Sequence, residues 1–317
     1  MKNKKIIFMG TPNFSVPILE MLIKNYNVEL VITQPDKKVG RKKILTPSPI
    51  KILAEKYNIK VIQPVKIYSD CKVLDEVKKI NPDIIITAAY GQIVPDSILN
   101  IPKYKAINVH ASLLPMLRGG APIQYALMND YKKTGITIMY MINKLDAGDI
   151  IEQKEIEITD DMNYDSLYEK LSNLGKNLLK DTLPKIFNNT INPIKQNENE
   201  VCFAYNITRH DEKIDWNDNS RIIFNKIRSL DSVPGAYTYL NNKIFKIYKS
   251  IIGEKGYSNV RPGTIIKQNK QYLLVKCGEN TTLKLKEVQI SGKKRMCINN
   301  FINSRNYEGI ILGENND

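Results

Sequence analysis

The side chains best suited to chemistry lie in residues 107–115, Ile-Asn-Val-His-Ala-Ser-Leu-Leu-Pro. If Ala106–Val109 is a strand, alternation sends Asn108 and His110 to the same side near its carboxyl end, where open α/β sheets bind ligands. An Asn amide can hydrogen-bond a developing oxyanion, and a His can move a proton near neutral pH. The chain has only two histidines. Catalysis is one interpretation of His110, and a structural histidine that caps the strand is the other.

A carboxylate follows farther along, in the run Leu-Asp-Ala-Gly-Asp at residues 145–149. Asp146 could hold the imidazole in one tautomer and stabilise its protonated form, although a simple Asp-x-Gly turn explains the pattern equally well. The run Arg-Gly-Gly-Ala-Pro at residues 118–122 could likewise be an anion-binding turn, or only a bend that starts a helix at Ile123–Met128. Spacing alone leaves these alternatives open.

A buried sheet must position these side chains, and the first half of the chain has the pattern for one. Short apolar runs alternate with amphipathic segments, which is typical of parallel strands covered by helices on both faces. We therefore predict an open, doubly wound, mostly parallel α/β sheet of the Rossmann-like kind. The predicted strands are Ile6–Met9, Val28–Thr33, Val61–Ile62, Asp83–Thr87, Ala106–Val109 and Ile136–Met141.

Two segments between these strands carry further expectations. Gln34–Pro47 is interpreted as a loop rich in Lys and Gly. Ser48 and Pro49 then predict a helix start, with Ser as the cap and Pro at the first helical position. The stripe expected to be buried on this helix is Ile50, Leu53, Ala54 and Tyr57.

The second half of the chain reads as a separate, β-rich unit. Periodicity breaks in the polar run at residues 188–193, which indicates a linker. A short helix is expected at Ser220–Ser229, followed by short strands of a small β-barrel or sandwich. These strands are Ala236–Leu240, Ile244–Tyr248, Gly263–Ile266, Tyr272–Lys276 and Thr282–Val288. The predicted division is a catalytic domain at 1–188, a linker at 189–206 and a C-terminal β-barrel domain at 207–317.

Charge is the strongest compositional feature of the 317-residue chain, which carries a formal +14 and has a pI near 9.3. Residues 1–150 carry a net +10, residues 151–200 a net −4 and residues 201–317 a net +8. Positive charge in both domains favours a polyanionic partner such as nucleic acid. A bias toward Lys, Asn and Ile in the underlying gene would produce the same excess.

Several classes of function are disfavoured. The four cysteines have no CxxC spacing and no nearby His, so neither a zinc site nor a disulfide framework is indicated. The turn after the first strand lacks GxGxxG, which argues against a nicotinamide cofactor. No apolar run of about 18 residues suggests a membrane span, and no signal peptide is evident. We expect a cytoplasmic monomer without a metal.

The residues above also carry a resemblance. The run at 108–115 followed by Arg118-Gly119 resembles the signature of the folate-dependent formyltransferases, and 136–141 with 145–149 resembles their second signature. Residues 8–12, 35–36, 40–43 and 47–49 and Ile214-Asp215-Trp216 extend the similarity over nearly the whole chain, toward the members of that family that act on tRNA. The resemblance implies a Rossmann-like catalytic domain and a C-terminal OB-like β-barrel.

The activity that this resemblance implies is formyl transfer from the co-substrate 10-formyltetrahydrofolate to the α-amine of initiator methionyl-tRNA, without a metal. By resemblance, Asn108 and His110 stabilise the oxyanion and shuttle the proton, and Asp146 orients the imidazole. The residues implied in folate binding are Ser112, Leu113, Leu114 and Pro115, together with Tyr90, Gly91, Gln92 and Ile93.

Contacts to tRNA are expected in two places. The basic loop at residues 36–46 has an arginine, Arg41, that matches the one entering the acceptor end of the tRNA in these relatives. Phosphates and unpaired bases offer contacts there. The candidate contacts are Lys37, Arg41, Lys42 and Lys43 in this loop and Lys293, Lys294 and Arg295 in the barrel. Val233 stands where relatives usually have Trp, so no stacking role is assigned to it.

Overall fold

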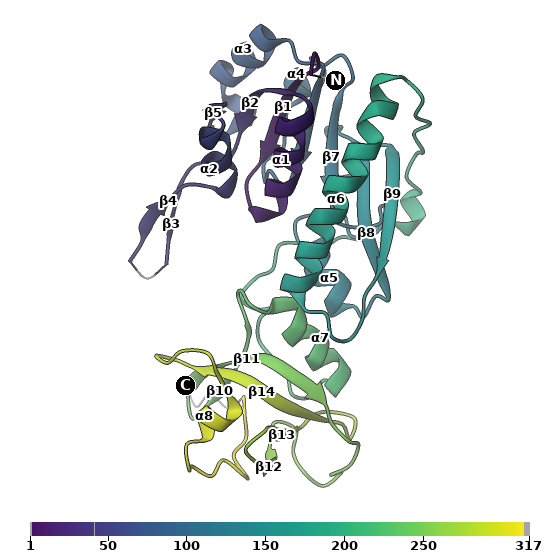
Figure 1. The fold of residues 1–317 in the computed structure, drawn as a ribbon. Coiled ribbons are helices and arrows are strands. Elements are labelled where there is room, and N and C mark those ends of the chain that lie inside the picture. Colours follow the sequence, from purple (N-terminus) through teal and green to yellow (C-terminus); the bar gives the residue numbers. More distant parts are fainter. Residues whose placement is uncertain (1, 41, 314–317) are drawn as a thin grey trace. The chain divides into compact units, whose positions relative to one another are not determined.

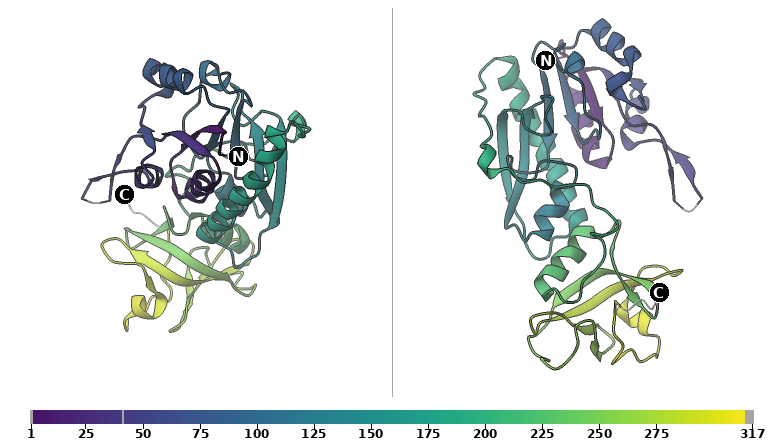
Figure 2. Two further views of the ribbon diagram at one scale, coloured as in Figure 1. Left: turned by 45° about the horizontal axis from the view of Figure 1, so that its top comes forward. Right: turned by 180° about the vertical axis from the view of Figure 1, so that it is seen from behind.

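The computed structural model describes residues 2–40 and 42–313 and divides into two compact units. Figure 1 and Figure 2 show a mixed α/β unit and a unit dominated by antiparallel strands. The first unit comprises Met1–Pro122, Lys133–Glu157 and Tyr168–Tyr205, and the second comprises Ile123–Lys132, Ile158–Leu167 and Asn206–Asp317. The expected Rossmann-like sheet and C-terminal β domain are thereby confirmed.

The first unit is organised around a seven-stranded sheet within the described residues. Its strands in spatial order are β5 (Lys60–Ile62), β2 (Asn27–Ile32), β1 (Lys5–Gly10), β6 (Ile84–Ala88), β7 (Ala106–His110), β8 (Lys133–Tyr140) and β9 (Ile150–Glu157). The first five run parallel, β8 pairs antiparallel with β7, and β9 pairs antiparallel with β8. The apolar runs of β1 and β6 are buried, as expected when helices cover both faces of a parallel sheet.

Helices cover the two faces of this sheet. The elements of this layer are η1 (Asn13–Ser15), α1 (Val16–Asn25), α2 (Pro49–Lys56), η2 (Ile67–Ser69), α3 (Cys71–Ile80), α4 (Asp96–Leu99) and α6 (Tyr164–Phe187). One apolar cluster joins buried residues of α3 and α4 to β1, β2 and β6. On α6, a Cβ added to Gly175 would stand 3.0 Å from Val109 of β7. The absence of a side chain at this glycine therefore lets α6 pack closely on the strand that carries the candidate catalytic residues.

Two details of the sequence interpretation are corrected in the segment before β5. The predicted loop at Gln34–Pro47 contains a two-stranded hairpin, β3 (Lys37–Val39) with β4 (Ile44–Thr46). Ser48 caps α2 as expected, because its hydroxyl accepts a hydrogen bond from Lys51 N. Tyr57, however, is 42% exposed, because α2 ends at Lys56 and leaves Tyr57 at the cap rather than on the buried stripe.

The second unit is an antiparallel barrel. The strand order is β10 (Ala236–Leu240), β11 (Lys243–Ile252), β14 (Thr282–Ile290), β13 (Leu273–Lys276) and β12 (Ile265–Gln268), with β15 (Met296–Cys297) beside β14. The C-terminal segment closes it: Leu312 N bonds Gly263 O before β12, and Gly313 N bonds Tyr239 O of β10. The core beneath includes Trp216 and apolar residues of α7 (Ser220–Leu230) and α8 (Ile298–Ile302).

Segments from the N-terminal half belong to this second unit, including most of α5 (Pro122–Met128). Arg228 of α7 is one of the polar links to them. Its guanidinium is buried, donates to Thr159 O at 2.8 Å and lies 3.6 Å from Asp130. The chain therefore passes between the two units more than once, and no single position in the sequence separates them.

Candidate active site

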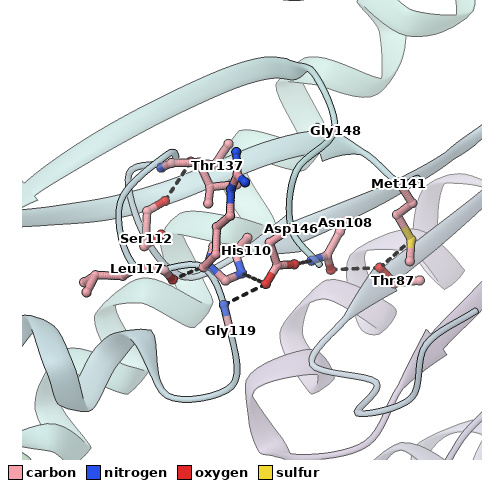
Figure 3. A network of polar contacts seen from close by, with 12 residues as sticks. Thr87, Asn108, His110, Ser112, Leu117, Gly119, Thr137, Met141, Asp146 and Gly148 are labelled. Carbon is pink, nitrogen blue, oxygen red and sulfur yellow. Dashed lines mark hydrogen bonds and ion pairs between the residues drawn. The ribbon is translucent and has the colours of Figure 1, made fainter. Parts of the chain in front are cut away.

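Asp146 is the centre of the polar network that follows β7. Its Oδ2 accepts a hydrogen bond from Gly119 N at 2.9 Å and lies 3.7 Å from His110 Nδ1, and its Oδ1 lies 3.4 Å from Asn108 Nδ2. Figure 3 shows the three predicted catalytic side chains turned toward one another. The structure therefore brings together residues separated by up to 38 positions in the chain.

Strand alternation and sheet register place the Asn and the His. Both side chains leave the same face of β7, whose neighbours are β6 and the antiparallel β8. Asn108 pairs in register with Thr87 of β6, and the Thr87 hydroxyl lies 2.8 Å from Asn108 Oδ1. Since a hydroxyl donates to that oxygen, the amide NH₂ is turned toward Asp146. An amide has two N–H groups, so one remains for a ligand.

His110 is 6% exposed, and its ring is held by a hydrogen bond at one nitrogen. Nε2 lies 3.0 Å from Leu117 O. A backbone carbonyl can only accept, so Nε2 carries a proton here and Nδ1 is the nitrogen that faces Asp146. The ring is thereby held in one orientation between a carbonyl and a carboxylate.

The loop that carries Asp146 is tightly folded against β8. Asp146 has a positive φ of 46°. At Gly148 a Cβ would stand 1.9 Å from Tyr140 O, so only glycine allows the chain to return so close to the strand. On the other side of the Asp146 carboxylate, Gly119 allows a close approach of the turn at residues 118–122, and its N–H bonds the carboxylate. The turn of residues 118–122 thus binds an anion, the carboxylate of Asp146, and also leads into α5.

The segment 112–117 forms a fixed wall beside the network. Thr137 of β8 donates its hydroxyl to Ser112 O at 2.7 Å and accepts from Leu114 N at 3.1 Å. The Gln153 amide donates to Leu114 O and to the Thr137 hydroxyl, each at 2.8 Å. The Ser112 hydroxyl donates to Met116 O at 2.7 Å, so it shapes the turn. Sequence reasoning missed Thr137 and Gln153, because nothing in a strand pattern marks such contacts.

Within this wall, only part of the predicted folate segment is open to solvent. Ser112 and Leu114 are buried, whereas Leu113 and Pro115 are half-buried. The apolar side chains of Leu113 and Pro115 are therefore the ones that a planar ligand could reach.

The other predicted folate residues lie on the loop after β6, which leaves the same sheet edge as the loop after β7. Tyr90 is buried, and its carbonyl accepts from Thr11 and from the Gln34 amide. Burial raises the pKa of the Tyr90 hydroxyl. Gly91 has a positive φ of 86° and opens the turn. The Gln92 side chain holds the segment at 64–67, and Ile93 is 69% exposed.

A segment that the sequence suggested only as a linker also supports the site. We call residues 194–205 the strap. Its Gln196 makes four hydrogen bonds: Oε1 accepts from Arg118 Nε and Nη2, at 3.0 and 2.8 Å, and Nε2 donates to Asp146 O and Gly148 O, each at 2.8 Å. Gln196 thereby ties together the two loops that hold the Asp146 carboxylate. Its isolated position among polar residues gave no signal in the sequence.

Arg118 is only 1% exposed, and a carboxylate of the strap, that of Glu198, neutralises its positive charge. Glu198 Oε1 accepts from Arg118 Nη2 at 2.9 Å, and Glu198 Oε2 from Lys144 at 3.0 Å. Hydrogen bonding to Arg118 first, and then to Lys144, lowers the pKa of Glu198 to about 2.

Replacing Gln196 with alanine is expected to lower kcat by about 10- to 100-fold while leaving the KM for each substrate nearly unchanged. The side chain orients the Asp146 loop and touches no reacting atom, so its loss loosens the geometry rather than the binding. Steady-state kinetics separate the two effects. The matched control is Gln268→Ala, whose amide also bonds backbone, at Arg305 O and Tyr307 N, but in the barrel. Equal kcat losses in both variants would mean a general loss of stability.

The lowered pKa of Glu198 predicts how the contribution of this carboxylate to the stability of the protein changes with pH. A carboxylate with a lowered folded-state pKa adds stability above its ordinary value, 4.5, and loses that contribution as the pH falls toward about 2. The stability difference between the protein and a Glu198→Gln variant should therefore be largest near pH 6 and shrink below pH ~4.5. Denaturant unfolding at several pH values measures it. A difference independent of pH would contradict the ion pair.

The predicted tRNA contacts in the first unit lie on the β3–β4 hairpin. Lys37, Lys42 and Lys43 are all exposed, and Arg41 lies outside the described residues. Three apolar side chains on the same hairpin are more than half exposed, namely Val39, Ile44 and Leu45. The hairpin thus presents both cations and exposed apolar side chains.

The barrel residues differ from one another. Lys293 and Lys294 are exposed. Arg295 donates to Asp231 at 2.6 Å and to Glu287, and its guanidinium lies over the Tyr248 ring. These two carboxylates already pair with the guanidinium and fix the β14–β15 turn, although the side chain remains exposed.

Three classes of feature are not found in the parts of the chain that the structure describes. No group of three or more His, Cys, Asp or Glu side chains is gathered as a metal site in residues 2–40 and 42–313. No two of the four cysteines, all of which the structure describes, are joined by a disulfide. Among the same residues, no helix has the length and apolar character needed to cross a membrane.

Comparison with known proteins gives a match along nearly the whole chain. Residues 4–183 match the formyl transferase family, and residues 206–306 match the C-terminal domain of formyl transferases. The methionyl-tRNA formyltransferases of Bacillus mycoides (strain KBAB4) and Bacillus thuringiensis subsp. konkukian (strain 97-27) are each 50% identical in sequence to this chain. The alignments cover 98% of this chain and 99% of each relative.

Solved structures share the fold at lower identity. WlaRD, a sugar 3N-formyl transferase, has a TM-score of 0.65 at 23% identity, covering 92% of this chain and 99% of that one. An N-formyltransferase from Helicobacter canadensis, in complex with folinic acid and dTDP-3-aminofucose, has a TM-score of 0.68 at 23% identity, covering 89% and 98%. At such identity the likeness shows the fold alone.

Proposed function

This chain belongs to the formyl transferase family, and we propose that it transfers the formyl group of 10-formyltetrahydrofolate to the free α-amino group of initiator methionyl-tRNA. The observation that carries the substrate assignment is the 50% identity, over 98% of the chain, to relatives named methionyl-tRNA formyltransferase. The product, N-formylmethionyl-tRNA, would serve translation initiation.

The reaction makes one C–N bond and breaks another. The α-amine attacks the formyl carbon, and the carbonyl oxygen becomes an oxyanion while the nitrogen becomes positive. Collapse expels N10 of the folate, which takes up one proton, and the amine loses one. A site for this chemistry therefore needs a donor for the oxyanion and a group that carries a proton from one nitrogen to the other.

Three side chains supply these functions in our proposal. Asn108 donates its second amide N–H to the oxyanion, since the Thr87 contact fixes which atom of the amide faces inward. The Nε2 of His110 is held by Leu117 O, so Nδ1 is the nitrogen left to accept the amine proton. The Asp146 carboxylate, 3.7 Å away, stabilises the imidazolium that results.

The folate co-substrate would lie along the wall of 112–115 and the loop of 90–93. Leu113 and Pro115 offer apolar surface there, while Ser112, Leu114, Tyr90 and Gln92 support the two loops from inside. Gly91 lets the second loop turn sharply. The apolar surface beside an amide donor fits a flat, partly apolar formyl donor.

The acceptor tRNA would be held by exposed lysines on both units. We assign phosphate contacts to Lys37, Lys42 and Lys43, and to Lys293 and Lys294, and we keep Arg41 as a base or phosphate contact by resemblance alone. Because such contacts release counterions, the affinity for tRNA should fall steeply with salt. All three proposed catalytic side chains come from one chain, so the proposed site needs no second copy, and we propose a monomer. Charged tRNA is used in the cytoplasm, where we expect the protein to act.

The test is an acceptor comparison with 10-formyltetrahydrofolate as donor. Methionyl-tRNA is offered in one reaction and a dTDP-linked amino sugar in the other, because one structural neighbour is named a sugar formyl transferase and another is in complex with dTDP-3-aminofucose. Formylation of methionyl-tRNA alone supports the proposal. Formylation of the amino sugar alone would replace the acceptor while keeping the chemistry.

A further inference from the structure

Two aromatic rings at the end of the strap have no part in the catalytic network. Phe203 is 43% exposed and Tyr205 is 65% exposed. Their ring centroids lie 5.8 Å apart and their planes are within 14°, so they form a stacked pair. The residue between them, Ala204, is fully buried. The backbone is therefore anchored. Both rings remain largely exposed, so their burial contributes little to the stability of the fold.

The pair is fixed directly beside the catalytic loop. Phe203 pairs with Arg118 in a parallel bridge. Arg118 N donates to Cys202 O at 3.0 Å, and Ala204 N donates to Arg118 O at 2.8 Å. A Cβ on Gly119 would stand 2.5 Å from Ala204 O. The strap thus lies against the residue whose N–H holds Asp146.

The backbone contacts make this position stiff. Ala121 N also donates to Ala204 O, at 3.1 Å, so the loop and the strap are joined on both sides of Gly119. An aromatic pair on such a support costs little entropy when it binds a flat partner, because its backbone is already ordered.

The chemistry of the proposed acceptor indicates which part of the tRNA would lie beside Phe203 and Tyr205. The reacting amine is esterified to the 3′ end of a tRNA, so the nucleotides just before it must run past the loops around Asp146. Those nucleotides are unpaired, and unpaired bases stack on exposed aromatic rings whatever their sequence.

We propose that Phe203 and Tyr205 form a stacking platform for the unpaired bases at the 3′ end of the acceptor tRNA. This inference rests on the proposed function, because the ring pair would bind the same tRNA substrate. The inner face of the strap holds the catalytic loops through Gln196, and its outer face binds the nucleic acid through the ring pair.

The kinetic test compares Phe203→Ala, Tyr205→Ala, Phe203→Leu and Phe203→Trp. Loss of a stacked ring should raise the KM for methionyl-tRNA about tenfold, with the KM for the folate unchanged. The Leu variant keeps apolar bulk but no π face and should behave like Ala, whereas Trp should restore the KM. Tyr57→Ala is the matched control, because Tyr57 is similarly exposed, at 42%, but lies at the end of α2.

A spectroscopic readout distinguishes stacking from a structural role. A tRNA carrying 2-aminopurine near its 3′ end should lose fluorescence on binding the unchanged protein and keep it on binding Phe203→Ala. Variants that lower kcat alone, with KM and fluorescence unchanged, would overturn the platform. If the unchanged protein formylates methionyl-tRNA and no ring variant alters KM, the platform fails while the function stands. If the unchanged protein does not formylate methionyl-tRNA at all, the function itself fails.

Discussion

Replacing His110 with glutamine is expected to lower kcat for formyl transfer by roughly 10²–10⁴-fold, the usual range for loss of a general acid–base group. Glutamine can still donate through its amide to Leu117 O, as Nε2 of the imidazole does at 3.0 Å. It cannot take the amine proton at neutral pH. The loss should therefore fall on the chemical step, and the KM for both substrates should change little.

Two controls keep this result interpretable. Thermal unfolding of the Gln variant should stay close to that of the unchanged protein, because the buried hydrogen bond is retained. His210, the other histidine, lies exposed in the second unit, and His210→Gln should retain full kcat. Retention of kcat within about threefold in His110→Gln would mean that the imidazole moves no proton in the rate-limiting step.

Replacing Asp146 with asparagine is expected to lower kcat by about 10²–10⁴-fold, as for a carboxylate that stabilises a catalytic imidazolium. Asparagine has the same shape and tolerates the positive φ of 46° at this position. Its carbonyl can still accept from Gly119 N, but its NH₂ then faces the NH₂ of Asn108. Two donors cannot bond each other, so the oxyanion donor is displaced and the negative charge beside His110 is lost.

Coupling between the two residues is measured with the double variant. If His110 and Asp146 act as one unit, His110→Gln combined with Asp146→Asn should be hardly slower than either single variant. Losses that multiply would show that the two side chains act independently, and that the 3.7 Å approach has no catalytic use.

The strands, and the face on which Asn108 and His110 lie, could be predicted because they depend on local patterns. β7 is a short apolar run with polar residues at alternate positions, and period-two alternation fixes the shared face of its polar side chains. The role of Asp146 came from resemblance, since the spacing also fitted a plain turn. Its pairing with Gly119 depends on where two loops meet, which no local pattern contains.

The strap was missed for the same reason. Gln196 lies 78 positions from Arg118, within a polar run that has no periodicity, and the sequence could mark it only as a linker. The closing of the barrel by residues 310–313 is likewise a long-range pairing. Tyr57 was misplaced because its helix ends one residue earlier than the apolar stripe suggests.

Charge counts do not show which cations are available to a partner. Arg295 is one of three consecutive basic residues, and the structure pairs it with Asp231 and Glu287, which lie 64 and 8 positions away. Sequence shows how many cations a segment has, but only the fold shows which of them already have a partner.

The most direct measurement follows a labelled formyl group in a single turnover. Excess protein is mixed with methionyl-tRNA and formyl-labelled 10-formyltetrahydrofolate, and label is counted on the α-amine of the methionine. The unchanged protein should move the label to the amine within one turnover, and His110→Gln should leave it on the folate over the same time. No label on methionyl-tRNA with the unchanged protein, or equal transfer by both proteins, would contradict formyl transfer through Asn108, His110 and Asp146.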